Sequence, residues 1–480
     1  MNRPVLIGVG CIQQKDIYSK LDEALILMDK AVNEAIKDTT NTEIINYIDE
    51  IQIPKGFWRY RDPGRWIAKK NNMNSLETRV CKIGILQQNL ISEACNRIKN
   101  GEINGSIIVG GESRYKLQRA SIENKKYYET KLEINPDKYI KAPNKLQMEV
   151  EEKELGPMAV GYYAILESAY RANSNLNLDE HNEFLAKIYS NYSQIAAKNK
   201  DGWIDEPYKK NDIKIESKKN SLQAYPYNKY HCTSWNVNQS CALIICSEKV
   251  ANFLNVPFEK RVYPLASSET NHMIATLQRP SLVSPEGMRL AADFILKICD
   301  KNKIAVNFYD FYSCFPVAVQ MFANSLNIKD ISQMTVTGGM PFAGGPLNSF
   351  VLHSTAKIVS EIRKKNDACG IVTGVSGMMT KQSYALWSKK PKINFTYKDF
   401  TKEARKKEKP INVSNNKNGK GEIIGYTIIK KNDKLKAVMF IHTSDNKRKL
   451  ITSTDCNIIQ SMKAEEWVGK NISFKENQLI

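Results

Sequence analysis

The residues with the clearest bearing on chemistry form a glycine- and proline-rich run, residues 337–348, in which four glycines fall within eight positions. Glycine reaches positive φ and lets the backbone approach another group closely. Such a run predicts a loop shaped around a ligand or around another backbone, and a plain tight turn is the alternative. Backbone N–H groups can polarise a carbonyl, and we expect Gly338, Gly339 and Ser376 to form an oxyanion hole of this kind.

Cys314 and His272 are the two side chains that we single out as candidate catalytic groups. Cys314 follows a predicted strand, where a thiol could act as a nucleophile or as an acid/base; a buried packing role beneath Phe315 is the alternative. His272 stands in a polar loop after another predicted strand, where it could contact a ligand or lie at the surface. His353 has helical spacing among apolar residues and is predicted to be structural.

The ten cysteines do not follow a metal-binding pattern. They are scattered over positions 11, 81, 95, 232, 241, 246, 299, 314, 369 and 456. Because no Cys-x-x-Cys pair or Cys/His spacing of a zinc site occurs among them, we predict no metal site. Most of them lie in apolar segments, which indicates small core residues in a reducing, cytoplasmic compartment.

The composition is that of a globular protein. Its 480 residues suffice for roughly two to four domains, and 42% hydrophobic with 25% charged residues is ordinary. No apolar run reaches the length of about 18 residues that a membrane span needs. The net charge of +19 is spread along a chain rich in lysine, asparagine and isoleucine. This spread favours coding bias and solubility over a nucleic-acid partner, and a phosphorylated small ligand stays open.

Strand and helix patterns alternate in the first part of the chain. Residues 5–9 and 106–111 are apolar on both faces, which predicts buried strands. Residues 21–36 and 83–98 are amphipathic at helical spacing. Such alternation implies a layered α/β fold with helices on both sides of a sheet, and residues 251–395 repeat it.

Two regions depart from this rhythm. Residues 112–235 are polar, tyrosine-rich and mostly helical, with the clearest helix at 178–198. The last 70 residues hold short alternating segments at 423–429, 435–443 and 448–453, which predict a small antiparallel β-domain, barrel-like and similar to an OB-fold. We divide the chain into a first α/β half (1–111 and 236–250), a helical excursion (112–235), a second half (251–395), a charged linker (396–410) and the β-domain (411–480).

Five motifs, taken in order, resemble those of one protein family. They are 89–113, a helix and strand ending in Gly-Gly-Glu-Ser; 235–242, Trp-Asn-Val-Asn-Gln-Ser-Cys-Ala; 310–315, Asp-Phe-Tyr-Ser-Cys-Phe; the glycine loop 337–348; and 374–377, Gly-Val-Ser-Gly. Together they resemble the thiolase superfamily, and more narrowly the sterol-carrier-protein-type thiolase-like proteins of the acetyl-CoA acetyltransferase family. The resemblance covers most of residues 1–395.

The resemblance implies a fold of duplicated α-β-α-β-α layers, with residues 112–235 as its loop domain and the β-domain as an addition. It implies acyltransferase chemistry in lipid metabolism, with coenzyme A or acyl-coenzyme A as ligand and no permanently bound cofactor. Arg114, Lys116 and Arg119 could approach the phosphates of that ligand, with solvated surface as the alternative. A homodimer is open, because the family dimerises through its core and the added domain could block this.

The catalytic places of the family carry other residues here. The place of the nucleophilic cysteine falls at Gly84, and Cys81 would take the role only if the register slips. The place of the activating histidine is Gly345. The places of the remaining acid/base and water-positioning groups fall at Thr373 or Ser376 and at Tyr312 or Ser313, respectively. The conventional thiolase machinery is therefore not visible.

We predict a thiolase-like protein that binds acyl-coenzyme A or a related thioester without conventional thiolase catalysis. A lipid or acyl-coenzyme A binder without any catalysis, or a partner scaffold, is the alternative. The residues expected around the substrate are Gly84, Tyr312, Ser313, Gly338, Gly339, Gly344, Gly345, Ser376 and Gly377. Gly84, Tyr312, Gly345 and residues 373–377 are expected to converge on one cavity.

Overall fold

The computed structural model describes residues 2–73, 75–142, 147–330, 334–432 and 434–480. Its first sheet has the strand order β1-β8-β4-β2-β3-β5. The strands are β1 (Pro4–Gln13), β2 (Glu50–Pro54), β3 (Glu77–Cys81), β4 (Gly105–Ser113), β5 (Lys138–Ile140) and β8 (Asn238–Ser247). Strands β4, β2, β3 and β5 run parallel, and β8 is antiparallel to both β4 and β1. Every residue of β2, β4 and β8 is buried, and the apolar run 106–111 predicted this for β4.

The second sheet has the strand order β10-β11-β12-β9-β13. Its strands are β9 (Tyr263–Thr270), β10 (Phe308–Asp310), β11 (Cys369–Ser376), β12 (Lys381–Ser388) and β13 (Thr396–Asp399). Strand β13 lies in the segment 396–410 that we treated as a linker, and it pairs in parallel with β9. Helix α13 (Thr401–Lys407) follows and packs against α10 and β9. The dense charges of this segment therefore belong to an edge strand and a surface helix.

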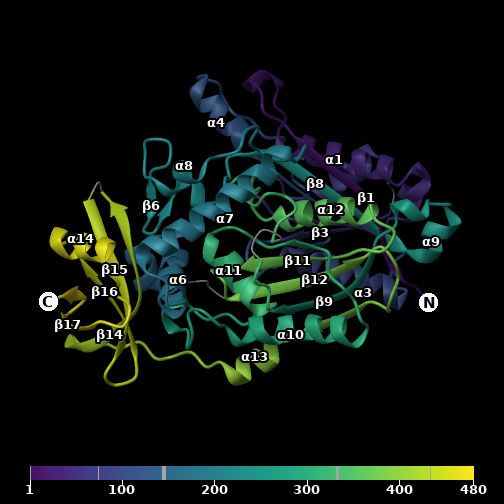
Figure 1. The fold of residues 1–480 in the computed structure, drawn as a ribbon. Coiled ribbons are helices and arrows are strands. Elements are labelled where there is room, and N and C mark those ends of the chain that lie inside the picture. The colour runs from purple at the N-terminus through teal and green to yellow at the C-terminus, as the bar shows by residue number, and fades with distance from the viewer. Residues whose placement is uncertain (1, 74, 143–146, 331–333, 433) are drawn as a thin grey trace.

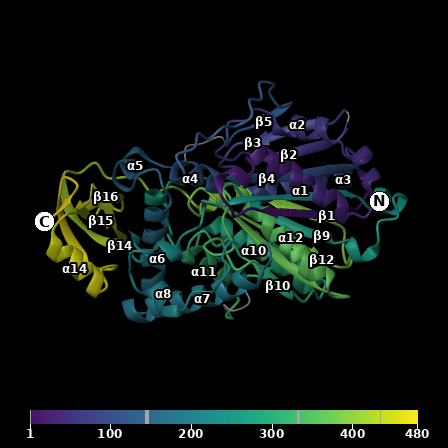
Figure 2. The same cartoon turned by 90° about the horizontal axis from the view of Figure 1, so that it is seen from above.

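Helices form three layers around the two sheets (Figures 1 and 2). Between the sheets lie α3 (Gln87–Asn100) and α12 (Phe350–Arg363), whose apolar residues share one core cluster with strands of both sheets. The outer layers contain α1 (Ala24–Asp38) and α2 (Pro63–Lys70) on the first sheet, and α10 (Glu286–Lys301) and α11 (Pro316–Ser325) on the second. The predicted sequence of layers, α-β-α-β-α, is present.

The polar excursion between β4 and β8 is largely helical. Its helices are α4 (Arg114–Ile122), α5 (Glu149–Leu155), α6 (Val160–Asn173), α7 (Leu178–Lys198) and α8 (Lys210–Lys214). A short hairpin, β6 (Leu222–Ala224) and β7 (Tyr227–Asn228), closes the excursion, and α9 (Glu248–Phe253) follows β8. Helix α7 has the bounds that its pattern predicts, and an Asn177–Glu180 capping box begins it.

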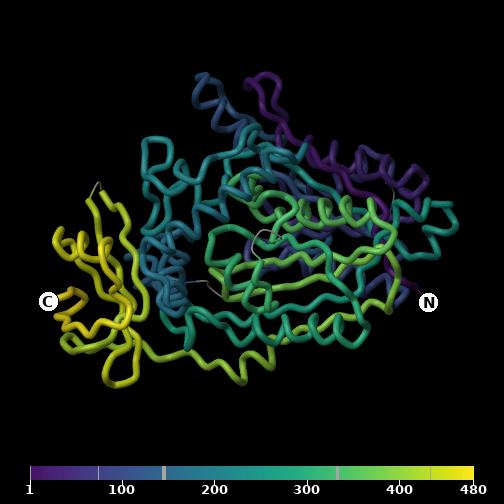
Figure 3. Tube along the Cα trace, viewed as in Figure 1, coloured from purple at the N-terminus to yellow at the C-terminus, as the bar shows by residue number. Residues whose placement is uncertain are grey.

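The C-terminal region forms a closed five-stranded barrel at the end of the molecule opposite the N-terminus (Figure 3). Its elements are β14 (Asn418–Lys431), β15 (Lys434–Thr443), β16 (Arg448–Ser453), α14 (Cys456–Ala464), β17 (Asn471–Lys475) and β18 (Gln478–Leu479). The barrel closes because β14 pairs with both β15 and β17. Phe474 is buried and Trp467 is partly buried against the same core.

The barrel is joined to the body through the excursion. Strand β6 pairs with β14 at Ala224 and Ile429 and extends the barrel sheet. The side chain of Arg171 on α6 is 1% exposed and forms an ion pair with Glu466 at 2.9 Å. No helix within the described residues is long and apolar enough to cross a membrane.

Candidate functional site

Loops that carry the predicted site residues meet at one edge of the two sheets. Tyr312 follows β10, and its backbone N–H donates to Thr373 Oγ1 of β11 at 2.9 Å. Ser313 accepts a hydrogen bond from the backbone N–H of Met340, in the glycine loop, at 3.0 Å. The segments around 312, 340 and 373 are thus in direct contact.

The segment before α3 joins the same group of loops. Lys381 pairs with Ser376 across the β11–β12 hairpin, and its ammonium group donates to Gly84 O at 2.8 Å. Gln87, the first residue of α3, accepts from the backbone N–H of Val351 in α12 at 2.7 Å. These contacts connect Gly84 to the β11–β12 hairpin and α3 to the end of the glycine loop. Whether they enclose one cavity stays a prediction.

The carboxylate of Asp310, at the end of β10, holds the glycine loop in place. This side chain is fully buried. Its Oδ1 accepts from the backbone N–H groups of Val336 and Thr337 at 2.9 and 3.0 Å and from the hydroxyl of Thr335 at 2.7 Å. Its Oδ2 accepts from the Ser354 hydroxyl of α12. Burial raises the pKa of this carboxyl.

The oxyanion hole that we predicted in this loop is wrong for two of its three donors. The N–H of Gly338 donates to Thr335 Oγ1 at 2.9 Å, and the N–H of Gly339 donates to Thr337 Oγ1 at 3.2 Å. Both donors are satisfied inside the loop, because threonines precede the glycines and fold back on them. Gly338 instead permits close packing, since a Cβ there would lie 2.4 Å from the backbone of Ala196 in α7.

Gly84 and Gly345, at the expected catalytic places, differ in how much space a side chain would have there. A Cβ on Gly345 would lie 2.2 Å from Thr233 Cγ2, so this place has no space for a side chain. A Cβ on Gly344 would meet the Gln239 amide oxygen at 2.3 Å. Gly84 has a φ of +105°, and a Cβ there would meet only Ala142 Cβ at 3.0 Å. Close packing thus excludes an imidazole at 345.

The thiols near this site are protonated at neutral pH. Burial raises the pKa of Cys81 and of Cys314 to about 12. Cys81 is fully packed in the core cluster between the sheets, and Cys314 is partly buried. A thiol is a much weaker nucleophile than a thiolate. Cys314 therefore lacks the activation that a nucleophilic role requires.

His272 is not a surface residue, and its loop contacts the β11–β12 hairpin, where the Thr380 hydroxyl donates to the His272 carbonyl at 2.8 Å. It is 7% exposed, and its Nε2 lies 2.8 Å from Glu408 O, just after α13. Burial lowers its pKa. The surface prediction failed because residues 396–410 form an edge strand and helix that cover this loop.

An arginine- and aromatic-lined pocket of about 870 Å³ lies between residues 57–61, α4 and residues 127–133. Arg59, Arg61, Arg114, Phe57 and Tyr127 are among its lining residues. The guanidinium of Arg114 stacks on the rings of Phe57 and Trp235, at 4.9 and 4.6 Å from their centroids.

Of the three cations predicted to approach phosphates, only Arg114 lines this pocket. Arg119 is paired with Glu123 at 2.6 Å. Lys116 lies over the ring of Tyr18 in a separate, more acidic hollow with Asp22 and Glu23. Arg59 and Arg61 were missed, although they stand together in the sequence as Arg-Tyr-Arg.

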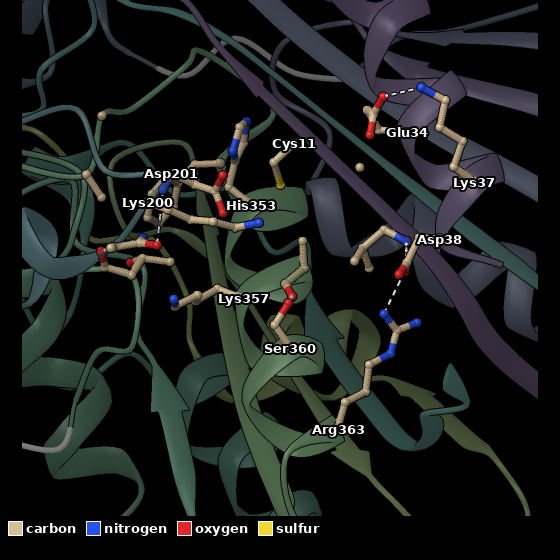
Figure 4. Close-up of a pocket in the computed structure, with 18 residues that line it drawn as sticks. Cys11, Glu34, Lys37, Asp38, Lys200, Asp201, His353, Lys357, Ser360 and Arg363 are labelled. Atoms are coloured by element: carbon tan, nitrogen blue, oxygen red, sulfur yellow. Dashed lines mark hydrogen bonds and ion pairs between the residues drawn. The ribbon is translucent and has the colours of Figure 1, made fainter. Parts of the chain in front are cut away.

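A second pocket of about 420 Å³ lies between β1, α1, α12 and the glycine loop (Figure 4). Of the residues predicted around the substrate, Gly344 lines it, whereas its other walls were not predicted. Cys11 and His353 line it together with Asp201, Lys357 and Arg363. Contact with the Cys241 thiol lowers the pKa of Cys11 to about 6. The sequence gives no signal for this group, because its members stand far apart in the chain.

Comparisons with known proteins place the fold. No family model and no curated protein matches the sequence. The structure is similar to that of a monomeric SCP2-thiolase-like protein type 1 from Mycobacterium smegmatis, with a TM-score of 0.82 and 21% identity over 100% of this chain and 98% of that chain. It also resembles the dimeric peroxisomal thiolase of Saccharomyces cerevisiae (TM-score 0.56, 15% identity, 81% and 98% covered). A third similar structure is the Acat5 thiolase from Ascaris suum in complex with coenzyme A (TM-score 0.54, 14% identity, 80% and 99% covered).

The predicted fold class is confirmed: the chain has the thiolase fold with an added C-terminal barrel. The full-length match to the mycobacterial protein includes the barrel, whereas the two thiolases match about four-fifths of this chain. At these identities the likeness concerns the fold, and the site must be argued from its own residues.

Proposed function

We propose that this protein binds coenzyme A or an acyl-coenzyme A thioester and does not carry out conventional thiolase catalysis. The proposal combines a fold that includes coenzyme A-bound members with expected catalytic places, Gly84 and Gly345, that lack a nucleophile–base pair. The single observation that carries the binding half is the arginine- and aromatic-lined pocket around Arg59, Arg61 and Arg114.

The pocket suits the nucleotide end of such a ligand. Guanidinium groups bind phosphate oxygens through paired, charge-assisted hydrogen bonds, and Arg59, Arg61 and Arg114 line one space. The rings of Phe57 and Tyr127 offer flat surfaces for a base. A volume of about 870 Å³ falls within the range of small-ligand pockets.

A short path leads from this pocket to the glycine loop. Trp235, which stacks under Arg114, follows Ser234 in the chain. The carbonyl of Ser234 accepts the N–H of Gly345 at 2.9 Å. A ligand anchored at the arginines could extend its thioester toward the 84, 312 and 345 segments.

The missing chemistry rests on packing and protonation. Gly345 has no room for an imidazole, and Cys81 and Cys314 are held as thiols by burial. Without a thiolate or an activating base at the expected catalytic places, these residues cannot take up an acyl group at a useful rate. We therefore expect a mixture of acetoacetyl-coenzyme A and coenzyme A to show no thiolysis above the uncatalysed background. If turnover occurs, the proposal fails, and Cys81→Ala and Cys314→Ala would identify the nucleophile.

Titration calorimetry with coenzyme A tests the binding half. Neutralising both outer arginines, Arg59→Gln with Arg61→Gln, should weaken binding by roughly tenfold for each lost phosphate contact. Arg119→Gln is the matched control, because this neighbouring arginine is paired with Glu123 and does not line the pocket. Binding that ignores the arginine pair, or an absence of binding, would contradict the proposal and favour a partner scaffold.

A further inference from the structure

Three side chains from three different elements bring soft ligand atoms together at the 420 Å³ pocket. Cys11 on β1 and Cys241 on β8 are direct cross-strand partners, with their Sγ atoms 3.5 Å apart. His353 stands in the first turn of α12, between the sheets. The ligand-capable atoms of the three side chains all lie within 4.8 Å of one another, and Figure 4 shows Cys11 and His353 side by side.

We propose that Cys11, Cys241 and His353 form a zinc site that is open toward this pocket. Zinc prefers thiolate and imidazole ligands in tetrahedral geometry. With Zn–S bonds of about 2.3 Å, a tetrahedral ion holds two sulfurs about 3.7 Å apart, close to the separation of 3.5 Å seen here. Only small side-chain adjustments are needed to enclose an ion.

The imidazole has a nitrogen available for this role. His353 Nε2 is buried and has no hydrogen-bond partner within the described residues. A buried nitrogen of this kind is costly unless something occupies it. A bound cation removes that cost and also keeps the two facing sulfurs apart.

Two thiolates would supply the negative charge that a Zn²⁺ ion needs. On binding, each thiol loses its proton to solvent, and the two thiolates balance the double charge of the ion. The fourth coordination position faces the pocket, where Lys357 and Asp201 stand. This open position gives room for a water or an anionic group, as in zinc sites with three protein ligands.

The proposal departs from the expectation that the chain holds no metal site. That expectation relied on short spacings within one segment, whereas Cys11 and Cys241 are 230 residues apart and meet only because β1 pairs with β8. The proposal does not depend on coenzyme A binding, whose arginines line the other pocket, although the glycine loop also lines this one.

Metal analysis of the purified protein under reducing conditions tests the site. We expect about one zinc per chain. After removal by a chelator, Co²⁺ should restore the site and give thiolate-to-cobalt charge-transfer absorption, a reading on the unaltered chain that needs no variant. Cys11→Ser, Cys241→Ser and His353→Asn should each weaken zinc affinity by at least the roughly 10–100-fold that loss of an outer-shell partner costs.

Two control variants test whether the loss of any buried thiol or imidazole lowers the zinc content. Cys246→Ser removes another buried thiol of β8, and His231→Asn removes another imidazole whose Nε2 is buried without a partner in the described chain. Both should leave zinc content unchanged. Metal content well below one per chain, a cobalt spectrum without thiolate bands, or a Cys11–Cys241 disulfide in place of bound metal would overturn the proposal.

Discussion

A single buried carboxylate shows how this chain keeps the shape of its glycine loop. Asp310 accepts hydrogen bonds from two backbone N–H groups and from three hydroxyls, and together these fix the start of the loop against β10 and α12. The loop resembles a catalytic one in sequence. The hydroxyls of Thr335 and Thr337, however, accept the backbone N–H groups of its first two glycines. The shape of the loop is thus held by residues that also satisfy the N–H groups of Gly338 and Gly339.

Replacement of Asp310 by alanine should be strongly destabilising. Five donors would lose their buried acceptor, and an unsatisfied buried donor costs about 1–3 kcal/mol. Because the loop can relax, we expect a loss of about 3–5 kcal/mol in the free energy of unfolding by urea. Asp310→Asn keeps one acceptor oxygen and should lose less. A change below about 1 kcal/mol for the alanine variant would show that the network does not hold the loop.

Glu112, in the predicted Gly-Gly-Glu-Ser motif, gives a prediction that depends on pH. Burial raises the pKa of its carboxyl from 4.5 to about 8, although the Phe57 N–H donates to it at 2.9 Å. Because the folded-state pKa lies above the unfolded one, its contribution to stability is complete below pH 4.5 and is lost as the pH rises toward 8.

Glu112→Gln should therefore raise the melting temperature at pH 8 and change it little at pH 5. The amide oxygen can still accept from Phe57, and the gain at pH 8 should be on the order of 1–3 kcal/mol. Thermal melts of both proteins across this pH range measure it. The exposed Glu43→Gln is the control, and an equal effect of Glu112→Gln at both pH values would be evidence against the assignment.

The sequence could predict which residues occupy the loops. It could not predict which hydrogen bonds and packing contacts those residues make. Gly84 and Gly345 stand where the resemblance expects a cysteine and a histidine, and this was visible from spacing alone. The donors that satisfy Gly338 and Gly339, the cover over His272 and the meeting of Cys11 with His353 were not visible. Each depends on a contact between segments far apart in the chain.

At the scale of elements, the barrel and the helical excursion form one joint structure. The β6–β7 hairpin adds to the barrel sheet at β14, and Ser168 of α6 accepts the Tyr426 N–H at 2.8 Å. Arg171 crosses the same contact, with both Glu466 carboxylate oxygens at 2.9 Å and the Tyr426 hydroxyl at 3.0 Å.

Arg171→Ala should loosen this joint. Loss of one partner from a buried, bidentate ion pair costs about 3–5 kcal/mol, and we expect the lower end because Glu466 is 35% exposed. Arg289→Ala is the matched control, since Arg289 makes a similar two-point contact with Glu286 on the surface of α10 and should cost below about 1 kcal/mol. Chemical denaturation compares the two variants, and equal losses would show that the joint contributes little.

Element types were easier to predict than element partners. Helix α7 and strand β16 have the bounds that their patterns predict, because periodicity is a local property. The parallel pairing of β13 with β9 was missed, since its four residues carry too little pattern and lie within a run of charges. The β6–β7 hairpin was missed for the same reason.

At the scale of the whole molecule, the net charge of +19 invites the idea of nucleic-acid binding. Among the described residues of the barrel, Phe474 is buried and Trp467 packs against the core, so neither ring is free to stack on a single strand. We predict only weak binding of single-stranded DNA in gel shifts at low salt, abolished at about 0.2 M salt, as purely electrostatic contacts require. Tight binding that resists salt would make the barrel a nucleic-acid module.

The most direct test of the central claim is a crystal structure of the protein with coenzyme A. We expect the phosphates at Arg59, Arg61 and Arg114 and the thiol directed toward Gly84 and Tyr312. We also expect no covalent bond to any cysteine when an acyl-coenzyme A is used instead. Coenzyme A bound elsewhere, or an acyl group attached to Cys81 or Cys314, would contradict the claim.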